Sequence, residues 1–178
     1  LPLFGGDWSL FILNNAYQLW MVAVVLSILW VAFSRNHPRR LTYLFASLLS
    51  FAVSGNLLAV TLSSAGPCYL QLLFGLDHYA PLFDHLTEVN DRTGTVWALA
   101  GQRILWNSYA HSEGFISGIS AMPSMHNVFA WLWVFAAWPQ RTLRYLTIIY
   151  ALLIFIGSIV LGWHYAVDGI AGFFLAIL

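Results

Sequence analysis

The stretch of sequence that decides the fold runs from residue 117 to residue 168. It opens with Ser-Gly-Ile-Ser-Ala-Met-Pro-Ser-Met-His, which ends at His126, and it closes with Gly-Trp-His-Tyr-Ala-Val-Asp, which contains His164 and Asp168. The chain between these segments is almost entirely apolar, with one break over residues 138–144. An apolar run with a single turn predicts a helical hairpin whose two open ends lie together. The two histidines and the aspartate are therefore the first candidates for chemistry.

The composition of the whole chain indicates an integral membrane protein. Of its 178 residues, 60% are hydrophobic and 8% are charged, whereas a soluble domain has about 25% charged residues. The basic residues are all arginine and the formal net charge is zero, so the bulk charge gives no reason to expect a nucleic-acid partner. Cys68 is the only cysteine, which excludes a disulfide within the chain.

Apolar segments of the length needed to cross about 30 Å of hydrocarbon recur along the chain. The predicted spans are residues 10–33, 41–63, 123–138, 145–161 and the segment that begins at residue 165. We therefore predict an all-α, polytopic transmembrane helical bundle that forms one domain over residues 1–178. Because we interpret the sequence as a fragment, we expect six spans in the complete protein. Gly169 and Gly172 in the last segment are expected to allow close helix packing.

Arginine placement predicts the orientation of the bundle. The two short turns at residues 34–40 and 139–144 contain most of the arginines: Arg35, Arg39, Arg40, Arg141 and Arg144. Short arginine-rich loops stay on the cytoplasmic side. The long polar region 65–121, with short helices expected around residues 69–76 and 96–106, then lies on the extracytoplasmic or lumenal face of a plasma, inner or Golgi-type membrane.

On this topology His126 and His164 lie at the same extracytoplasmic face. His164 and Asp168 are four residues apart, and such residues share a face of a helix. A carboxylate that accepts the proton of one imidazole nitrogen leaves the other nitrogen free to attack. His126, on the opposite side of a cleft, is placed to protonate a leaving group.

A phosphate-binding element is predicted just before the third span. Pro123 favours the start of a helix. The amides of Ser124, Met125 and His126 would then be unsatisfied donors at a helix N-terminus, where phosphate binds well. We therefore name Ser124 and Met125 as candidate phosphate-binding residues.

Two motifs in this order resemble those of the type 2 phosphatidic acid phosphatase superfamily. Pro-Ser-Met-His, ending at His126, resembles its central motif, and Gly-Trp-His-Tyr-Ala-Val-Asp-Gly resembles the H-x-x-x-D end of its third motif. The longer forms look most like the inositolphosphotransferase branch, which includes inositolphosphorylceramide synthases. The resemblance implies that His164 forms a phosphohistidine, that Asp168 orients it, and that His126 protonates the departing oxygen and then activates water or an alcohol.

The cationic phosphate clamp of that superfamily is missing. Its K-x6-R-P motif is absent, and Gly157 and Ser158 occupy positions where the third motif normally has Ser-Arg. A phosphoryl group needs stabilising charge, and only Arg92 and Arg103 are predicted on the extracytoplasmic side. We expect Arg103 to take this role.

The sequence leaves several functions open. The enzyme would act on a lipid phosphate among membrane lipids, either by hydrolysis or by transfer to an alcohol acceptor, with no metal and no cofactor. One alternative is a transporter or assembly factor with a degenerate site. Another is a haem protein with His126 and His164 as axial ligands. The oligomeric state stays open.

Overall fold

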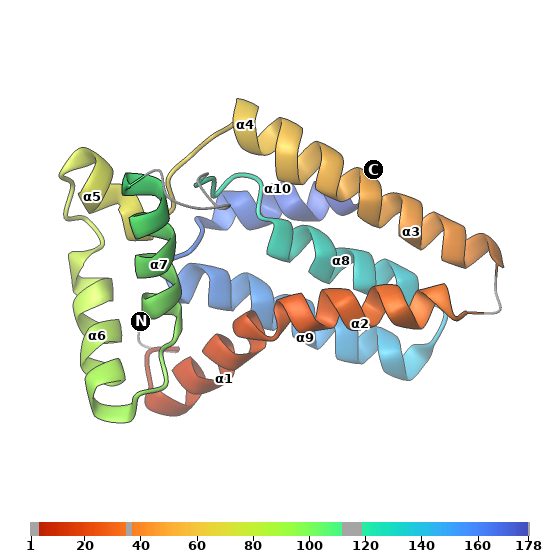
Figure 1. Ribbon diagram of the computed structural model, residues 1–178. Coiled ribbons are helices and arrows are strands. Elements are labelled where there is room, and N and C mark those ends of the chain that lie inside the picture. The colour runs from red at the N-terminus through yellow and green to blue at the C-terminus, as the bar shows by residue number, and fades with distance from the viewer. Residues whose placement is uncertain (1–3, 35–36, 112–118, 178) are drawn as a thin grey trace.

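The computed structural model describes residues 4–34, 37–111 and 119–177, and all its regular structure is helical, as predicted (Figure 1). Arg35, Glu113 and residues 117–118 of the first motif lie outside the described residues. The α-helices are α1 (Asp7–Gln18), α2 (Trp20–Ala32), α3 (His37–Ala52), α4 (Ala59–Thr61), α5 (Leu70–Phe74), α6 (Ala80–Thr93), α7 (Ala98–Ala110), α8 (Met125–Ala137), α9 (Arg141–Val160) and α10 (Ala166–Ile177). A π-helical segment, η1 (Val53–Leu58), joins α3 to α4, and a short 3-10 helix, η2 (Pro67–Tyr69), precedes α5.

Helix α8 is the centre of the bundle. It packs against α3, α9 and α10, and Val128, Phe129 and Ala130 are fully buried on three successive directions around its axis. A helix that is apolar on all sides is stable only when other helices surround it. The first histidine motif therefore ends at the N-terminus of the most enclosed helix.

Close packing between α8 and α10 depends on glycine, as expected from the sequence. A Cβ atom added at Gly172 would lie 2.9 Å from the carbonyl oxygen of Ser124 and 3.2 Å from the amide nitrogen of Val128. Both are backbone atoms, which cannot move aside as a flexible side chain can. The two chemical motifs are thus held together by direct backbone contact.

Replacing Gly172 by alanine is expected to lower the free energy of unfolding by about 1–3 kcal/mol, the usual cost of overpacking. Gly101→Ala is the matched control, because its added Cβ would meet only the Trp163 ring at 3.5 Å and a helical alanine is favoured over glycine. Both variants are compared by denaturant unfolding in detergent micelles. Equal stability of Gly172→Ala and the wild-type protein would contradict this packing.

The first predicted span is broken. Helices α1 and α2 meet at Leu19 with a bend of 45°, and no glycine or proline lies at the junction. Contacts from distant segments hold α1 in its direction: the amide of Ala98 donates to Asn14 Oδ1 (3.0 Å), and the Tyr150 hydroxyl donates to the carbonyl oxygen of Ala16 (2.8 Å). The bend is therefore a tertiary feature without a local sequence signal.

Two helices of the described chain are long and apolar enough to cross a membrane. These are the continuous segment Pro38–Thr61 and α9, and the bent pair α1–α2 makes a third if it counts as one span. Helices α8 and α10 have 13 and 12 residues, which corresponds to only about 20 Å and 18 Å of length. The structure thus supports a membrane protein with two or three candidate spans, fewer than the five predicted.

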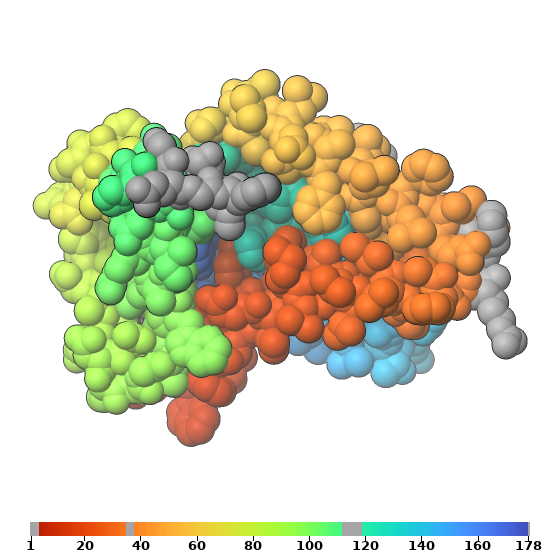
Figure 2. Space-filling view, viewed as in Figure 1, coloured from red at the N-terminus to blue at the C-terminus, as the bar shows by residue number. Residues whose placement is uncertain are grey.

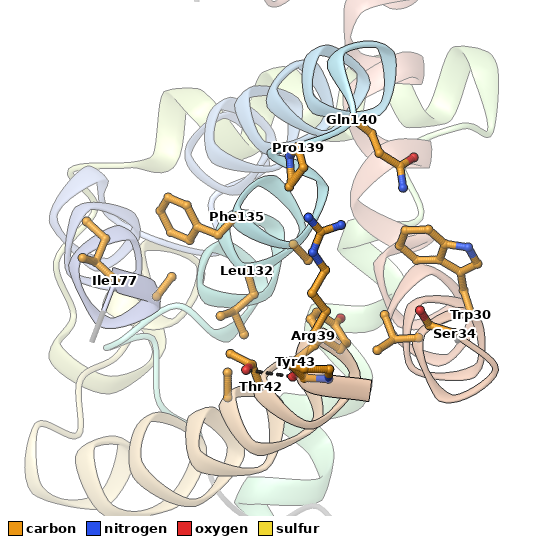
Figure 3. A pocket seen from close by; sticks show the side chains of 15 residues that line it. Trp30, Ser34, Arg39, Thr42, Tyr43, Leu132, Phe135, Pro139, Gln140 and Ile177 are labelled. Atoms are coloured by element: carbon orange, nitrogen blue, oxygen red, sulfur yellow. Dashed lines mark hydrogen bonds between the residues drawn. The ribbon is translucent and has the colours of Figure 1, made fainter. Parts of the chain in front are cut away.

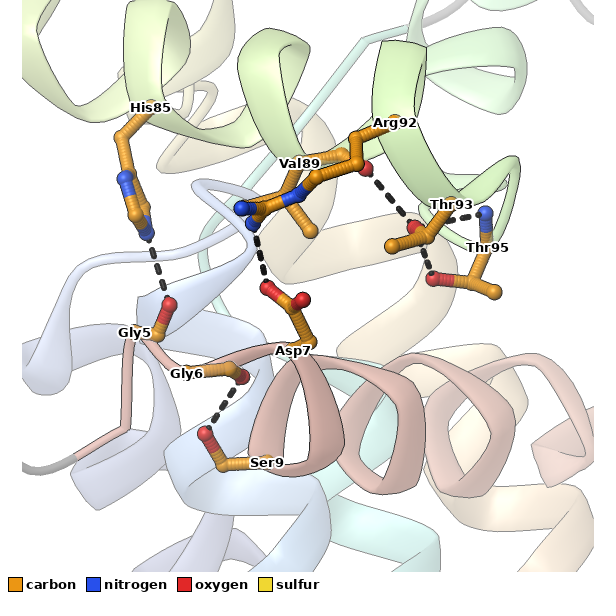
Figure 4. Close-up of polar contacts among 9 residues, drawn as sticks. All are labelled: Gly5, Gly6, Asp7, Ser9, His85, Val89, Arg92, Thr93 and Thr95. Carbon is orange, nitrogen blue, oxygen red and sulfur yellow. Dashed lines mark hydrogen bonds and ion pairs between the residues drawn. The ribbon is translucent and has the colours of Figure 1, made fainter.

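Helices α5–α7 gather at one end of the bundle, at the left of Figure 1. The apolar pattern of the sequence did not predict α6, because this helix is mostly polar. Pro81 at its start and Gly94 at its end are nevertheless typical helix boundaries. It is attached to the N-terminal segment at two points (Figure 4): His85 Nε2 donates to the carbonyl oxygen of Gly5 (2.7 Å), and Arg92 pairs with Asp7 (2.6 Å).

The two arginine-rich turns lie together at the other end, as predicted. Both contribute to a cavity of about 560 Å³ between α2, α3, α8 and α10. Figure 3 shows the Arg39 side chain reaching from α3 towards Pro139 in the turn between α8 and α9. Neither His126 nor His164 lines this cavity, so it is separate from the candidate chemistry.

Candidate active site

The two histidines meet in a second cavity, at the end of the bundle that carries α5–α7. Its volume is about 510 Å³, and both His126 and His164 line it. The centroids of their rings are 6.0 Å apart, with the ring planes at 59°. Figure 2 shows a hollow between α7, in green, and the orange-red N-terminal helices, with the blue C-terminal part of the chain visible inside it. The hairpin of α8 and α9 therefore does what the sequence predicted: it returns the chain to the same end.

A backbone carbonyl fixes the tautomer of His164. Its Nδ1 lies 2.8 Å from the carbonyl oxygen of Ala121. His164 as a whole is 7% exposed. Because a carbonyl oxygen only accepts hydrogen bonds, Nδ1 carries the proton in the neutral ring, and the lone pair is on Nε2. The free nitrogen expected of a nucleophile is thus present. The hydrogen bond that leaves Nε2 free is made to the carbonyl of Ala121 and not to the carboxylate of Asp168.

Asp168 acts differently from the expectation. Its Oδ2 is 3.7 Å from His164 Nδ1, which is too long for a hydrogen bond, and it accepts instead the amide of Tyr165 (2.8 Å). The reason is that α10 begins at Ala166, so His164 lies before the helix and does not share a helical face with Asp168. The buried carboxylate closes the turn that carries His164, within ion-pairing distance of a protonated ring.

His126 is held by aromatic rings. The Tyr17 ring stacks on it with centroids 4.2 Å apart and planes at 14°, and the Trp20 ring is also 4.2 Å away, at 34°. Among the described residues, His126 has no hydrogen bond and no ion pair to another side chain. No sequence pattern predicts this arrangement, because aromatic residues are abundant in membrane proteins as interface residues.

The predicted phosphate cradle is only partly available. The amide of Ser124 donates to the carbonyl oxygen of Asp168 (3.2 Å), and the Ser124 hydroxyl accepts from Asn127 Nδ2 (3.0 Å). Ser124 is fully buried and does not line the cavity, whereas Met125 does. The expectation of a free Ser124 amide is therefore wrong, because the close approach of α10 uses that donor.

Neither candidate arginine lines the cavity. Arg92 is paired with Asp7 on the outside of α6. Arg103 is exposed on α7, whose inward side is formed by Gln102, bonded to the carbonyl oxygen of Leu161, and by Leu105. The undescribed residues 112–118 contain no lysine or arginine. A phosphate-binding role for Arg103 stays a prediction without support from its position.

Two neutral donors in the cavity wall are without a hydrogen-bond partner in the described part of the chain. They are the hydroxyl of Tyr17 and the indole Nε1 of Trp163, both buried atoms of lining residues. The third aromatic donor of the wall, the Tyr69 hydroxyl, is engaged with the carbonyl oxygen of Gln102 (3.1 Å). Buried donors usually have partners, so Tyr17 and Trp163 are available to a ligand. The described residues hold no group of three His, Cys, Asp or Glu side chains suited to a metal ion.

We expect Cys68, close to the cavity in η2, to resist alkylation. Burial raises the pKa of its thiol to about 12, and only the thiolate is a nucleophile. Its reaction with iodoacetamide should therefore be slow at pH 7 and rise roughly tenfold per pH unit towards pH 9. Mass spectrometry of native protein and of protein unfolded in SDS checks this. Equal rates in the two states at pH 7 would contradict the burial.

Comparison with known proteins agrees with the two motifs. The family model described as the PAP2 superfamily matches residues 3–178. No curated protein and no solved structure matches the chain. Because the match covers nearly the whole chain and includes both histidine segments, the chain belongs to the PAP2 superfamily, whose members are typically phosphohydrolases or phosphotransferases acting on phosphate esters.

Proposed function

We propose that this protein is an integral-membrane phosphatase or phosphotransferase that cleaves a phosphoester of a lipid-linked substrate through a phosphohistidine at the extracytoplasmic face. The observation that carries the proposal is the pair His126 and His164, 6.0 Å apart between ring centroids, in the wall of one cavity. A protein of the PAP2 superfamily with this pair has the two groups that phosphoryl transfer needs, a nucleophile and a proton donor.

In the first step, the Nε2 lone pair of His164 forms a bond to phosphorus while the bond from phosphorus to the leaving oxygen breaks. His126 gives its proton to that oxygen. In the second step, water or an alcohol gives a proton to His126 and attacks the phosphohistidine, which releases the phosphorylated product and restores His164. The Ala121 carbonyl keeps the Nδ1 proton of His164 in place throughout.

A lipid-linked substrate is supported by the other walls of the cavity. Gly55, Ala59 and Val60 line it from η1 and α4, and Leu105 lines it from α7. These groups suit an apolar chain, whereas the phosphoryl oxygens need hydrogen-bond donors. We assign the phosphoryl oxygens to the amide end of α8 at Met125, with Trp163 as a further donor. Ser124 holds this end of α8 in place through its hydrogen bonds with Asp168 and Asn127.

Transfer to an alcohol, as in the inositolphosphotransferase branch, is the form of the reaction that we favour, because the longer motifs resemble that branch. The test offers purified protein in liposomes a panel of lipid phosphomonoesters and phosphodiesters, with and without alcohols such as inositol and ceramide. Transfer predicts that a new phosphodiester appears only when a suitable alcohol is present. Release of free phosphate from every substrate regardless of alcohol would leave hydrolysis as the activity.

The absence of a cation among the described lining residues favours one other function, a transporter or assembly factor with a degenerate site. This function predicts no turnover of any phosphoester and no phosphohistidine. Vanadate, which mimics a five-coordinate phosphoryl group, would then fail to bind. A visible absorption band in the purified protein would point instead to haem bound through the histidines.

A further inference from the structure

We propose that Trp20 and Tyr17 are positioning residues for His126, whose ring contacts restrict its imidazole so that it delivers a proton to the leaving oxygen. The proposal rests on the proposed phosphoester chemistry and adds residues that lie outside both histidine motifs. The evidence is the geometry of the stack: each aromatic ring centroid is 4.2 Å from that of His126.

The two histidines are oriented by different means. His164 is fixed by a hydrogen bond from Nδ1 to Ala121, which leaves one nitrogen for chemistry. Among the described residues, His126 has no such bond, so both of its nitrogens stay free. The Tyr17 ring stacked on the imidazole and the Trp20 ring tilted against it at 34° restrict its plane without occupying either nitrogen. This suits a group that must release a proton and then take one up.

The bend between α1 and α2 creates the stack. Tyr17 lies in the last turn of α1 and Trp20 is the first residue of α2, on either side of Leu19. Both side chains are 5% exposed. Tyr17 lines the cavity but Trp20 does not. An effect of Trp20 on the reaction is therefore indirect, and His126 is the cavity-lining ring that Trp20 contacts.

The stack also matches the charge of a proton donor. An imidazole that donates a proton is a cation before the reaction, and the faces of tryptophan and tyrosine attract cations. The groups that face His126 from the packed elements are Tyr17 and Trp20 on its ring faces and His164 across the cavity. Within the described residues no carboxylate pairs with His126, so the two aromatic rings are the contacts suited to attract its protonated form.

The test compares Trp20→Leu and Trp20→Phe on two substrates that differ in the leaving group. With an alkyl alcohol as leaving group, which needs a proton, Trp20→Leu should lower kcat about tenfold with little change in KM. With 4-nitrophenol, which leaves without a proton, the rate of nitrophenol release in the first turnover should stay within about twofold of the wild-type rate for the same variant. Trp20→Phe, which keeps a ring, should retain most of the activity on both substrates.

Two further variants complete the test. Phe51→Leu is the control for aromatic loss, because the Phe51 ring contacts Phe129 and neither histidine, and it should behave like the wild-type protein. Tyr17→Leu removes both the stacked ring and a hydroxyl that is available to substrate, so it is compared with Tyr17→Phe, which keeps the ring; only Tyr17→Leu should show the leaving-group pattern of Trp20→Leu. Equal loss on both substrates, or a Trp20→Phe variant as impaired as Trp20→Leu, would overturn the positioning role. A wild-type protein that turns over neither substrate would overturn the proposed function itself.

Discussion

His164→Ala is expected to reduce turnover by a factor of about 10⁴–10⁶, the largest effect that we predict for a single substitution. Among the described residues that line the cavity, only His164 has a free nitrogen that is set by a hydrogen bond at the other nitrogen. In the proposed mechanism, no covalent intermediate can form without it. The remaining cavity would bind substrate but supply only the proton donor.

The measurement is a single-turnover reaction with radioactively labelled substrate, stopped in alkali, in which phosphohistidine survives. Wild-type protein should carry label and His164→Ala should carry none. His111→Ala is the matched control, since His111 is exposed at the end of α7 and its ring bonds, within the described part of the chain, only to the carbonyl oxygen of Asn107. Label on the His164→Ala protein would show that another residue is the nucleophile.

His126→Ala is expected to lower kcat by about 10²–10⁴ on substrates with an alkyl leaving group, the usual contribution of a general acid. With 4-nitrophenol as leaving group, the rate of phosphohistidine formation in the first turnover should be nearly unaffected, because that oxygen departs without a proton. Steady-state turnover of that substrate should still fall, because His126 also activates the second step. The reason is the division of work between the rings: His126 lacks the fixed tautomer of His164 and lies across the cavity from it.

Rates on both substrates, together with the labelling experiment, check this second prediction. The His126→Ala protein should still form phosphohistidine from the nitrophenyl substrate and should accumulate it, because nothing then activates water or alcohol for the second step. Loss of labelling with this substrate would mean that His126 is needed for attack as well. The roles of the two histidines would then have to be revised.

The protein class, the central hairpin and the candidate histidines could be predicted from local sequence patterns. The excess of apolar residues indicated a membrane protein, and the apolar run with one turn predicted the hairpin that unites His126 and His164. These features depend on hydrophobicity and on spacing along the chain, which a sequence displays directly. The two short motifs led to the superfamily for the same reason.

The details of the site could not be read in this way. The hydrogen-bond partner of His164 is a backbone carbonyl, and every residue has one, so no residue type marks Ala121. The start of α10 at Ala166 separates His164 from the helix that the spacing to Asp168 had suggested. The outward direction of Arg103 follows from which face of α7 packs on the bundle. Each of these outcomes depends on contacts between distant segments.

The sequence by itself therefore determined the class of the protein, the ends of its central hairpin and the residues with the capacity for chemistry. Only the tertiary structure decided how these residues are held: His164 by Ala121, and His126 by Tyr17 and Trp20 across a bend that has no glycine or proline. The physical reason is that composition and periodicity are local properties, whereas the orientation of a side chain is set by whatever packs against it.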